Sequence, residues 1–450
     1  MKLLLVILRG IFVILIAIAA IHETGIGLLQ AFGLRMPGHA HFVMTGSFDN
    51  PGPYGGLVAA MMSLLVAYIV IDKKTYSEEV GPSAPLRGFL LLCRAVALLS
   101  VSLCIIVLPA SMSRAAWLSA GVALLLLAFR ECGLRIWIRN HRLAASLFTV
   151  VLVLMIAGAF LLKKDSAIGR FHIWHMELRA ICQNPLHGTG EGTVLGTYGK
   201  VQAEYFAQKQ RSETLTRVAG CPEYAFNEYL KVGVEHGIPA MACVVFVIGA
   251  VIAYAIRRRM PVGYGFASLA VFAFFSYPLS ALRTESDAEK QWRSLRHLSS
   301  VELYEDAVQE YGILYDAERD GGLKGNYRFL YDYGYALHKT GKYEESNRAL
   351  QEGARLSSDP MFHNIMGRNH EAMQQYEEAE REYLTAHHMV PSRLYPLILL
   401  MEMHVALGDF QSATRYANLA LQLPVNQRLT TMRDLHDRAL HCLDTLAFYR

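Results

Sequence analysis

Long apolar runs are the feature that most constrains this chain. Seven of them approach the roughly 17–25 residues that a helix needs to cross a bilayer. They lie near 3–21, 55–71, 88–109, 115–129, 143–162, 236–256 and 263–282. Hydrophobic residues make up 53% of the 450 residues and charged residues only 18%, which is unusually apolar for a soluble protein of this length. We therefore predict an all-α, polytopic membrane protein.

The first run resembles a signal peptide, because it begins Met1-Lys2. However, Arg9 interrupts its apolar stretch and no small-residue cleavage site follows cleanly. We therefore expect an uncleaved first span.

Basic residues gather in alternate short loops and predict the orientation. These residues are Lys73, Lys74 and Arg87 in one loop, Arg130, Arg135, Arg139 and Arg142 in a second, and Arg257, Arg258 and Arg259 in a third. Because cytoplasmic loops are enriched in lysine and arginine, we expect these three loops inside the cell. The 163–235 segment and the tail after about 283 then lie on the outer, periplasmic side.

Composition also excludes several classes of function. The formal net charge of +4 is small and no basic patch with interleaved aromatic residues occurs, so we expect no nucleic-acid partner. The seven cysteines form no CxxC pair, so we expect no zinc or redox motif. Cys182 and Cys221 either pair in an oxidising compartment or remain isolated thiols, since sequence fixes no distance between them.

From about 290 the chain becomes charged, tyrosine-rich and patterned like helices. Tyr343, Tyr376 and Phe410 recur at about 33–34 residues, the tetratricopeptide period. A small residue follows each of them by three positions, at Ser346, Ala379 and Ala413. A proline, which cannot continue a helix, ends each unit, at Pro360, Pro391 and Pro424. We predict a membrane domain over 1–282 and a tetratricopeptide-like α-solenoid over 283–450, whose concave surface offers a site for a protein or glycan partner.

Two arginines on the predicted outer side are candidate phosphate ligands. Arg114 lies in "LPASMSRAAW" at the edge of a span, and Arg170 opens "GRFHIWHMELRAICQNPLHGTGEG". A guanidinium suits a phosphate because it is permanently charged and presents a fork of donors. The alternatives are a snorkelling side chain at 114 and a plain surface charge at 170.

Two further features lie in the outer segments. Asn227, Glu228, Lys231 and Glu235 share roughly one helix face that leads into an apolar span, where polar groups are costly and are expected to face a cavity or partners. The glycine turn at 188–192 lacks the Lys-Ser/Thr ending of a nucleotide loop.

We expect positive φ at Gly188, Gly190 and Gly192 in this turn. A helix from about Arg170 should precede it, with Trp174 and Leu178 on the inner face. Our hypothesis is that the turn folds its segment over the membrane mouth, and the alternative is a surface turn without a role in the site.

Taken together, the motifs resemble the O-antigen ligase family, whose superfamily also holds O-antigen polymerases and some protein oligosaccharyltransferases. The matching stretches are "GSFDNPGPYGG", "SRAAW", "GR" with "IW", "NPLHGTGEG" and "AFNEYLKVGVEHGIP". The tail resembles the tetratricopeptide extension of the Bacteroidetes branch. The resemblance covers nearly the whole chain.

The resemblance implies a glycosyltransferase of the bacterial inner membrane that takes a glycan from undecaprenyl pyrophosphate. Its acceptor would be lipid A-core or another molecule, and neither a metal nor a cofactor is expected. Arg114 and Arg170 would hold the pyrophosphate, and Asn50, Trp174 and Gly190 are further candidate substrate contacts.

The position of the catalytic base is where this chain departs from the family pattern. Many ligases carry a histidine where this chain has Phe226. We therefore take Asn227, Glu228 and Glu235 as the candidate catalytic residues, with Tyr224 and His187 as alternative bases. Three other functions remain open: an O-antigen polymerase, a protein O-oligosaccharyltransferase and a non-catalytic membrane scaffold for the repeats.

Overall fold

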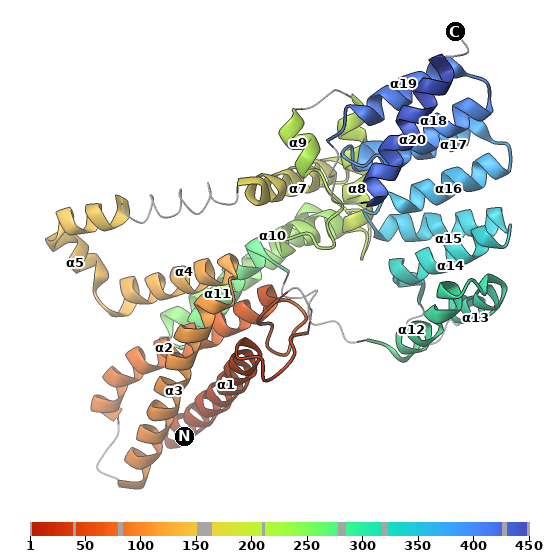
Figure 1. Cartoon of the computed structure of the whole chain (residues 1–450). Helices are drawn as coiled ribbons and strands as arrows, with labels where there is room; N and C mark the ends of the chain where they lie inside the picture. Colours follow the sequence, from red (N-terminus) through yellow and green to blue (C-terminus); the bar gives the residue numbers. More distant parts are fainter. Residues whose placement is uncertain are drawn as a thin grey trace. The chain divides into compact units, whose positions relative to one another are not determined.

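The computed structural model describes residues 2–38, 42–79, 84–150, 164–208, 212–277, 285–316, 323–424 and 430–447. These residues form helices and loops without strands, which confirms the predicted all-α fold. By their contacts they divide into two compact units (Figure 1). Unit 1 comprises Met1–Leu162, Phe226–Tyr229 and Ala240–Arg283, and unit 2 comprises Lys163–Ala225, Leu230–Pro239 and Thr284–Arg450.

Unit 1 contains the apolar N-terminal helices and the apolar part of α10. They are α1 (Lys2–Ala31), α2 (Pro51–Glu79), α3 (Ala84–Ala110), α4 (Arg114–Glu131), α5 (Leu134–Asn140), most of α10 (Glu228–Arg257) and α11 (Val262–Phe275). Four helices are long and apolar enough to cross a membrane, over Val6–Ala31, Pro51–Asp72, Leu86–Ala110 and Glu228–Arg257. A fifth span results if α4 and α5, bent by 81°, count as one.

Two of the seven predicted spans differ from this set. Helix α11 ends after 14 residues, which is short for a span. The run at 143–162 lies largely outside the described residues.

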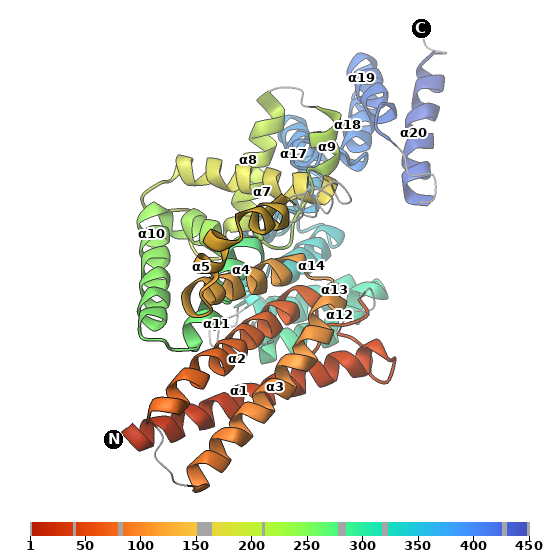
Figure 2. The same ribbon diagram turned by 90° about the vertical axis from the view of Figure 1, so that its left-hand side faces the viewer.

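Helix α2 forms the centre of unit 1, packed against α1, α3, α4 and α11. Small residues let these helices approach closely, as is usual between helices in lipid. Ala17 and Ala97 are fully buried, and the Ser100 hydroxyl of α3 donates to the Ala17 carbonyl of α1 at 3.0 Å. Figure 2 shows α1, α2 and α3 side by side, as their contacts require.

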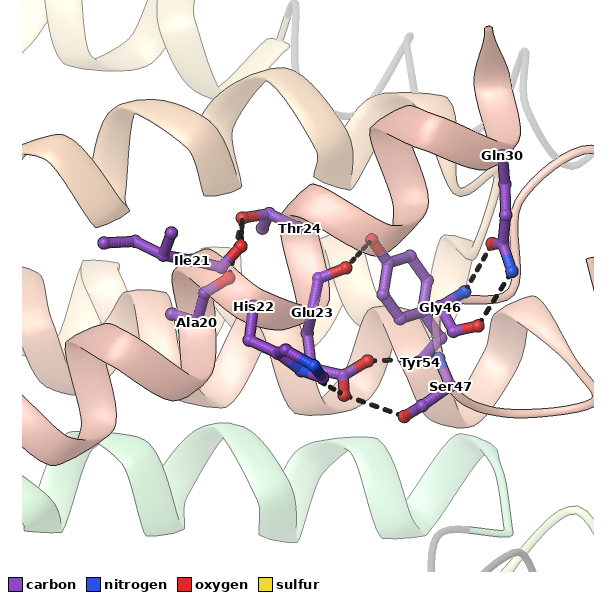
Figure 3. A network of polar contacts seen from close by, with 9 residues as sticks. All are labelled: Ala20, Ile21, His22, Glu23, Thr24, Gln30, Gly46, Ser47 and Tyr54. Carbon is purple, nitrogen blue, oxygen red and sulfur yellow. Dashed lines mark hydrogen bonds and ion pairs between the residues drawn. The ribbon is translucent and has the colours of Figure 1, made fainter. Parts of the chain in front are cut away.

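Helix α1 continues ten residues beyond the apolar run that ends near 21. Its 30 residues span about 45 Å at 1.5 Å per residue, longer than the roughly 30 Å hydrocarbon core. The extension carries Glu23 and Gln30, whose side chains bind the loop that precedes α2 (Figure 3). Their hydrogen bonds explain why a polar stretch remains helical.

The loop before α2 is fixed by these two side chains. The Glu23 carboxylate accepts from the Ser47 hydroxyl at 2.8 Å and from the Ser47 N–H at 3.2 Å. The Gln30 amide oxygen accepts from the N–H groups of Thr45 at 2.9 Å and Gly46 at 2.8 Å, and its nitrogen donates to the Gly46 carbonyl at 2.9 Å. The loop therefore enters α2 along one fixed path.

Unit 2 contains α7 (Lys164–Gln183), α8 (Val194–Gln208), α9 (Glu213–Val218) and a series of paired helices. The series is α12 (Asp287–Ser300), α13 (Tyr304–Asp316), α14 (Tyr327–Lys339), α15 (Tyr343–Leu356), α16 (Met361–Ala372), α17 (Tyr376–Met389), α18 (Tyr395–Ala406), α19 (Phe410–Leu421) and α20 (Thr430–Ala447). Ser346, Ala379 and Ala413 are fully buried where paired helices meet. The arrangement is consistent with the predicted α-solenoid.

Helix α8 packs directly on the solenoid, against α15 and α17. A Cβ atom at Gly196 would overlap the backbone of Arg355, so only glycine permits this approach. The Gln202 amide of α8 also donates to the Met389 carbonyl at the end of α17. Residues 163–225 thus belong to the same compact unit as the tail.

The inner face of α7 differs from the predicted one. Leu178 is 49% exposed, so its predicted place on that face was wrong, and Trp174 is only partly buried. The buried residues are His172, Met176, Glu177, Ala180 and Ile181. Positions 172, 176 and 180 form a stripe at i, i+4 and i+8 that packs on α8. This stripe forms the inner face of α7, and Leu178 lies outside it.

The loop fixed by Glu23 and Gln30 allows a direct test of this packing. Gly46 has φ +60° and a Cβ atom there would overlap the Tyr54 ring, whereas Gly33 has φ +71° with open space around it. We expect Gly46→Ala to lower the thermal unfolding midpoint in detergent by at least about 4 °C more than Gly33→Ala, because it adds a steric clash to the same backbone strain. Equal midpoints for the two variants would contradict the packing of this loop.

Candidate functional site

Three helices of unit 1 begin close together, at what we call the motif end: the N-terminal ends of α2, α4 and α10. Helices α2 and α4 approach most closely at Gly55. A Cβ atom there would lie 2.9 Å from the Ser113 Cβ and 3.1 Å from the Ser111 hydroxyl. Glycine at 55 therefore brings the start of α2 against the start of α4.

Tyr277, just after α11, joins the start of α10 to the start of α2. Its ring meets the Phe226 ring edge-on, with centroids 5.5 Å apart. A Cβ atom at Gly52 would lie 3.8 Å from the Tyr277 hydroxyl and 3.7 Å from the Ser276 hydroxyl. Tyr277 is only 7% exposed. The Tyr229 hydroxyl also donates to the Ala270 carbonyl of α11 at 2.9 Å, which fixes α10 on the same side.

Two predicted site residues cap helices at the motif end. The Asn50 side chain accepts from the Gly52 N–H at 2.8 Å, at the start of α2. The Asn227 side chain accepts from the Tyr229 N–H at 3.0 Å, at the start of α10. Asparagine is among the preferred residues at this position because its oxygen satisfies an otherwise unbonded N–H group. Both side chains therefore help to orient helix N-termini.

Helix N-termini and Arg114 give the motif end positive charge, and the Glu228 carboxylate offsets part of it. Helix N-termini carry partial positive charge and expose N–H groups, so three of them together attract a phosphate. Arg114 is the first residue of α4 and is exposed, and Glu228 is the first residue of α10 and is 6% exposed. The structure thus places Asn50, Arg114, Asn227 and Glu228 at one end of unit 1.

The remaining predicted site residues belong to unit 2. Arg170 and Trp174 lie on α7 and are partly buried, with the Trp174 ring edge-on to Phe171 at 5.7 Å. His187 is exposed, and Tyr224 is partly buried. Gly190 and Glu235 meet at the glycine turn.

The glycine turn packs on the first part of α10. Gly188, Gly190 and Gly192 have φ values of +68°, +106° and +76°, which confirms the predicted positive φ. The Gly190 N–H donates to the Glu235 carbonyl at 3.0 Å, and the Gly192 N–H donates to the Glu235 carboxylate at 3.1 Å. A Cβ atom at Gly188 would overlap the Glu235 backbone. Glu235 therefore holds this turn.

Helix α10 breaks just after these contacts. Gly237 has φ 85° and ψ 175°, outside the helical region. The Ile238 N–H donates to the Pro185 carbonyl at 2.8 Å in place of a helical bond. The break separates the residues that hold the turn from the apolar part of the helix, Ala240–Arg257.

A buried polar network lies between α7 and α8. The His172 Nε2 atom is 2.8 Å from the Gln202 side-chain oxygen, and the Gln202 amide donates to the Gly220 carbonyl at 3.0 Å. Burial lowers the pKa of His172 below its usual value, which favours a neutral ring. The ring is only 5% exposed, so its contacts assign it to the α7–α8 interface.

Glu177 is a titratable group that the sequence motifs did not single out. It is 1% exposed within an apolar cluster that includes Met176 and Ile181. Burial raises the pKa of its carboxyl group well above the ordinary value, because an apolar environment disfavours the charged form. The sequence signal for its burial was its position on α7 between Met176 and the apolar pair Ala180 and Ile181.

Metal-ligating clusters and disulfides are not observed in the described part of the chain. No group of three or more ligating side chains comes together there. Cys182 and Cys221 are both free thiols, and the Arg393 guanidinium donates to the Cys221 sulfur at 3.1 Å.

Comparisons with known proteins identify the region that carries these features. A search of curated proteins found no match. Residues 99–245 match the family model described as O-antigen ligase. The matched region runs from α3 into α10 and includes Arg114, Arg170, the glycine turn and Asn227–Glu235. Over residues 99–245, about a third of the chain, this match confirms the resemblance to the O-antigen ligase family that the motifs indicated.

Proposed function

We propose that this protein transfers a glycan from undecaprenyl pyrophosphate to an acceptor such as lipid A-core. The match of residues 99–245 to the O-antigen ligase family supports a membrane glycosyltransferase of the O-antigen ligase or polymerase type. The observation that carries the choice of donor is the convergence of three helix N-termini at the motif end, next to Arg114.

The distribution of basic residues supports an outward-facing motif end. Helices α2, α4 and α10 all start at the motif end. Helix α4 ends near Arg130, and α10 ends at Arg257. In the sequence of α2, Lys73 and Lys74 also come late. Because basic residues favour the cytoplasmic side, the motif end faces the periplasm in this proposal, where lipid-linked glycans are polymerised and transferred.

In the reaction, an acceptor hydroxyl attacks the anomeric carbon and the bond from that carbon to the pyrophosphate oxygen breaks. The pyrophosphate leaves with the electron pair of that bond, and the configuration inverts. Arg114 and the helix N-termini stabilise the negative charge on the leaving group. From the family resemblance, Arg170 is also a candidate pyrophosphate ligand, and Trp174 and Gly190 are candidate substrate contacts.

A general base removes the proton from the attacking hydroxyl. Glu228 is the proposed base, because it belongs to unit 1 with Arg114 and Asn227 fixes the start of its helix. Glu235 instead accepts a hydrogen bond from the Gly192 N–H, which suits a role in holding the turn. Tyr224 and His187 are the alternative bases.

We expect Arg114→Ala to lower glycan transfer at least about tenfold, since a lost charged contact to phosphate costs roughly 1.5–3 kcal/mol. Arg114→Lys should restore part of the rate, because lysine keeps the charge without the forked geometry. Arg130, at the opposite end of the same helix, is also exposed and provides the matched control. Transfer at the wild-type rate by a normally expressed Arg114→Ala variant would refute the pyrophosphate assignment.

The deletion strain itself, compared with the strain that carries the wild-type protein, identifies the acceptor. Lipopolysaccharide is separated by chain length on a gel. Complete loss of attached polymer supports a ligase, and single repeat units still attached to the core support a polymerase. An unchanged profile favours protein glycosylation or a scaffold and counts against the lipid A-core acceptor.

The two glutamates should respond differently to neutralisation. Glu228→Gln should lower kcat about a hundredfold or more, because an amide cannot accept the proton. Glu235→Gln should retain most activity, because its amide oxygen still accepts from the Gly192 N–H. Both variants are assayed with the same lipid-linked donor at saturating concentration. The reverse order of activities would assign the base to Glu235.

A further inference from the structure

A cavity of about 870 Å³ lies within unit 2, between α8 and the solenoid. We call it the α8 groove. One wall comes from α8 and the glycine turn before it, and the other comes from α15, α16 and α17. Both walls belong to unit 2, so the shape of the groove is set by that unit alone.

The walls of the groove are held together by direct contacts. At Gly196, α8 touches the backbone of Ala354 and Arg355 so closely that a side chain would not fit. The Ser358 hydroxyl donates to the Pro222 carbonyl at 2.9 Å, which fixes the segment after α9 to the solenoid. A ligand entering such a preformed cavity has few groups to order, which favours binding.

One wall carries a ladder of hydroxyl groups. Thr189, Thr193 and Thr197 follow one another at intervals of four residues. The Thr189 hydroxyl is 2.7 Å from the Thr193 hydroxyl, and it accepts from the Thr197 hydroxyl at 3.2 Å. The Thr189 and Thr193 hydroxyls also donate to backbone carbonyls, at 3.2 and 2.7 Å. Because a hydroxyl oxygen that donates can still accept, this wall suits a ligand whose own hydroxyls donate.

The opposite wall offers further polar side chains. Gln351 of α15 and Thr385 and His388 of α17 line it. The His363 ring nitrogen Nδ1 is 2.6 Å from the Glu382 carboxylate. Planar amide, imidazole and carboxylate groups allow directional hydrogen bonds from several sides of a ligand.

The charges in the α8 groove balance, which argues against an anionic ligand. Its lining includes two cations, Lys200 and Arg355, and two carboxylates, Glu204 and Glu382. A diphosphate or a nucleic acid needs an excess of cations. The groove is therefore distinct in chemistry from the motif end.

The apolar part of the lining argues against a peptide helix. It consists of alanines together with Val201, Met366 and Met389, and the lining includes no Phe, Tyr, Trp, Leu or Ile. Peptide helices bind by inserting anchors into deep apolar grooves with such residues. The short alanine side chains and the flexible methionines instead leave apolar surface that the C–H faces of sugar rings can cover.

One end of the α8 groove is the glycine turn of the family motif. Thr189 lines the groove, while its N–H donates to the Val234 carbonyl of α10 at 2.9 Å. We propose that the α8 groove binds an uncharged, hydroxyl-rich stretch of the glycan that the protein transfers, several sugar units long. This proposal rests on the proposed function for the identity of the glycan.

The test measures glycan binding by the full chain in nanodiscs. The probe is O-polysaccharide released by mild acid from the lipopolysaccharide of the expressing cells and labelled at its reducing end with a fluorophore. Thr385→Trp fills the groove, and Gln351→Ala removes one hydrogen-bonding side chain as a milder second variant. Thr445→Trp is the matched control, because Thr445 is exposed on α20, away from the groove. The hydroxyls of Thr385 and Thr445 each donate to the carbonyl four residues earlier in their own helix, at 2.8 Å.

We expect Thr385→Trp to raise the Kd for the probe at least about tenfold and Gln351→Ala about threefold, with Thr445→Trp unchanged. Wild-type affinity in both groove variants, or no binding of the probe to the wild-type protein, would refute the proposal. Binding of a labelled peptide digest that Thr385→Trp abolishes, without glycan binding, would assign the groove to peptides and equally refute it.

Arg114→Ala separates this proposal from the proposed function. It should lose transfer while it keeps the wild-type Kd for the probe. If Arg114→Ala transfers normally while the groove variants lose probe binding, the pyrophosphate assignment fails and the groove assignment stands.

Discussion

The close approach of α2 to its neighbours at Gly52 and Gly55 is the constraint on which the motif end depends. With no side chain at 55, the start of α2 lies against Ser111 and Ser113 at the start of α4. At Gly52, the same helix meets Tyr277, whose ring contacts Phe226 just before α10. A larger residue at Gly55 would push apart the starts of α2 and α4 and so disperse the partial positive charge of their N-termini.

A second set of contacts fixes the path of the chain into α2. Glu23 and Gln30, on the extended end of α1, bind the backbone of the loop at 45–47. That loop leads to Asn50, which caps α2. Polar residues that look anomalous at the end of an apolar helix therefore serve to hold the motif end.

Much of the fold follows from sequence periodicity. Apolar runs predicted the membrane helices, and the recurrence of Tyr343, Tyr376 and Phe410 predicted the helix pairs of the solenoid, because both patterns repeat with the geometry of a helix. The continuation of α1 to Ala31 was not predicted, because hydropathy does not register hydrogen bonds made to a distant loop. Leu178 was placed inward because the register of a single helix does not show which neighbour it packs on.

The candidate site was only partly accessible from sequence. Arg114, Asn50, Asn227 and Glu228 were recognised from motifs, and the structure brings them to one end of unit 1. Tyr277 was missed, since a tyrosine at the end of an apolar run has no distinctive spacing. The contacts of Gly196 with the solenoid were also missed, because residues 196 and 355 are far apart in the chain and only tertiary structure joins them.

The central claim is that the motif end binds the pyrophosphate of a lipid-linked donor. Photo-cross-linking tests it most directly, with a polyprenyl diphosphate that carries a diazirine beside the diphosphate and with mass spectrometry to locate the adducts. We predict adducts on residues 50–55, 111–114 and 226–229 that excess unlabelled polyprenyl diphosphate abolishes. Adducts confined to the exposed face of α3, for example at Leu98, Leu99 and Ile105, would contradict the claim.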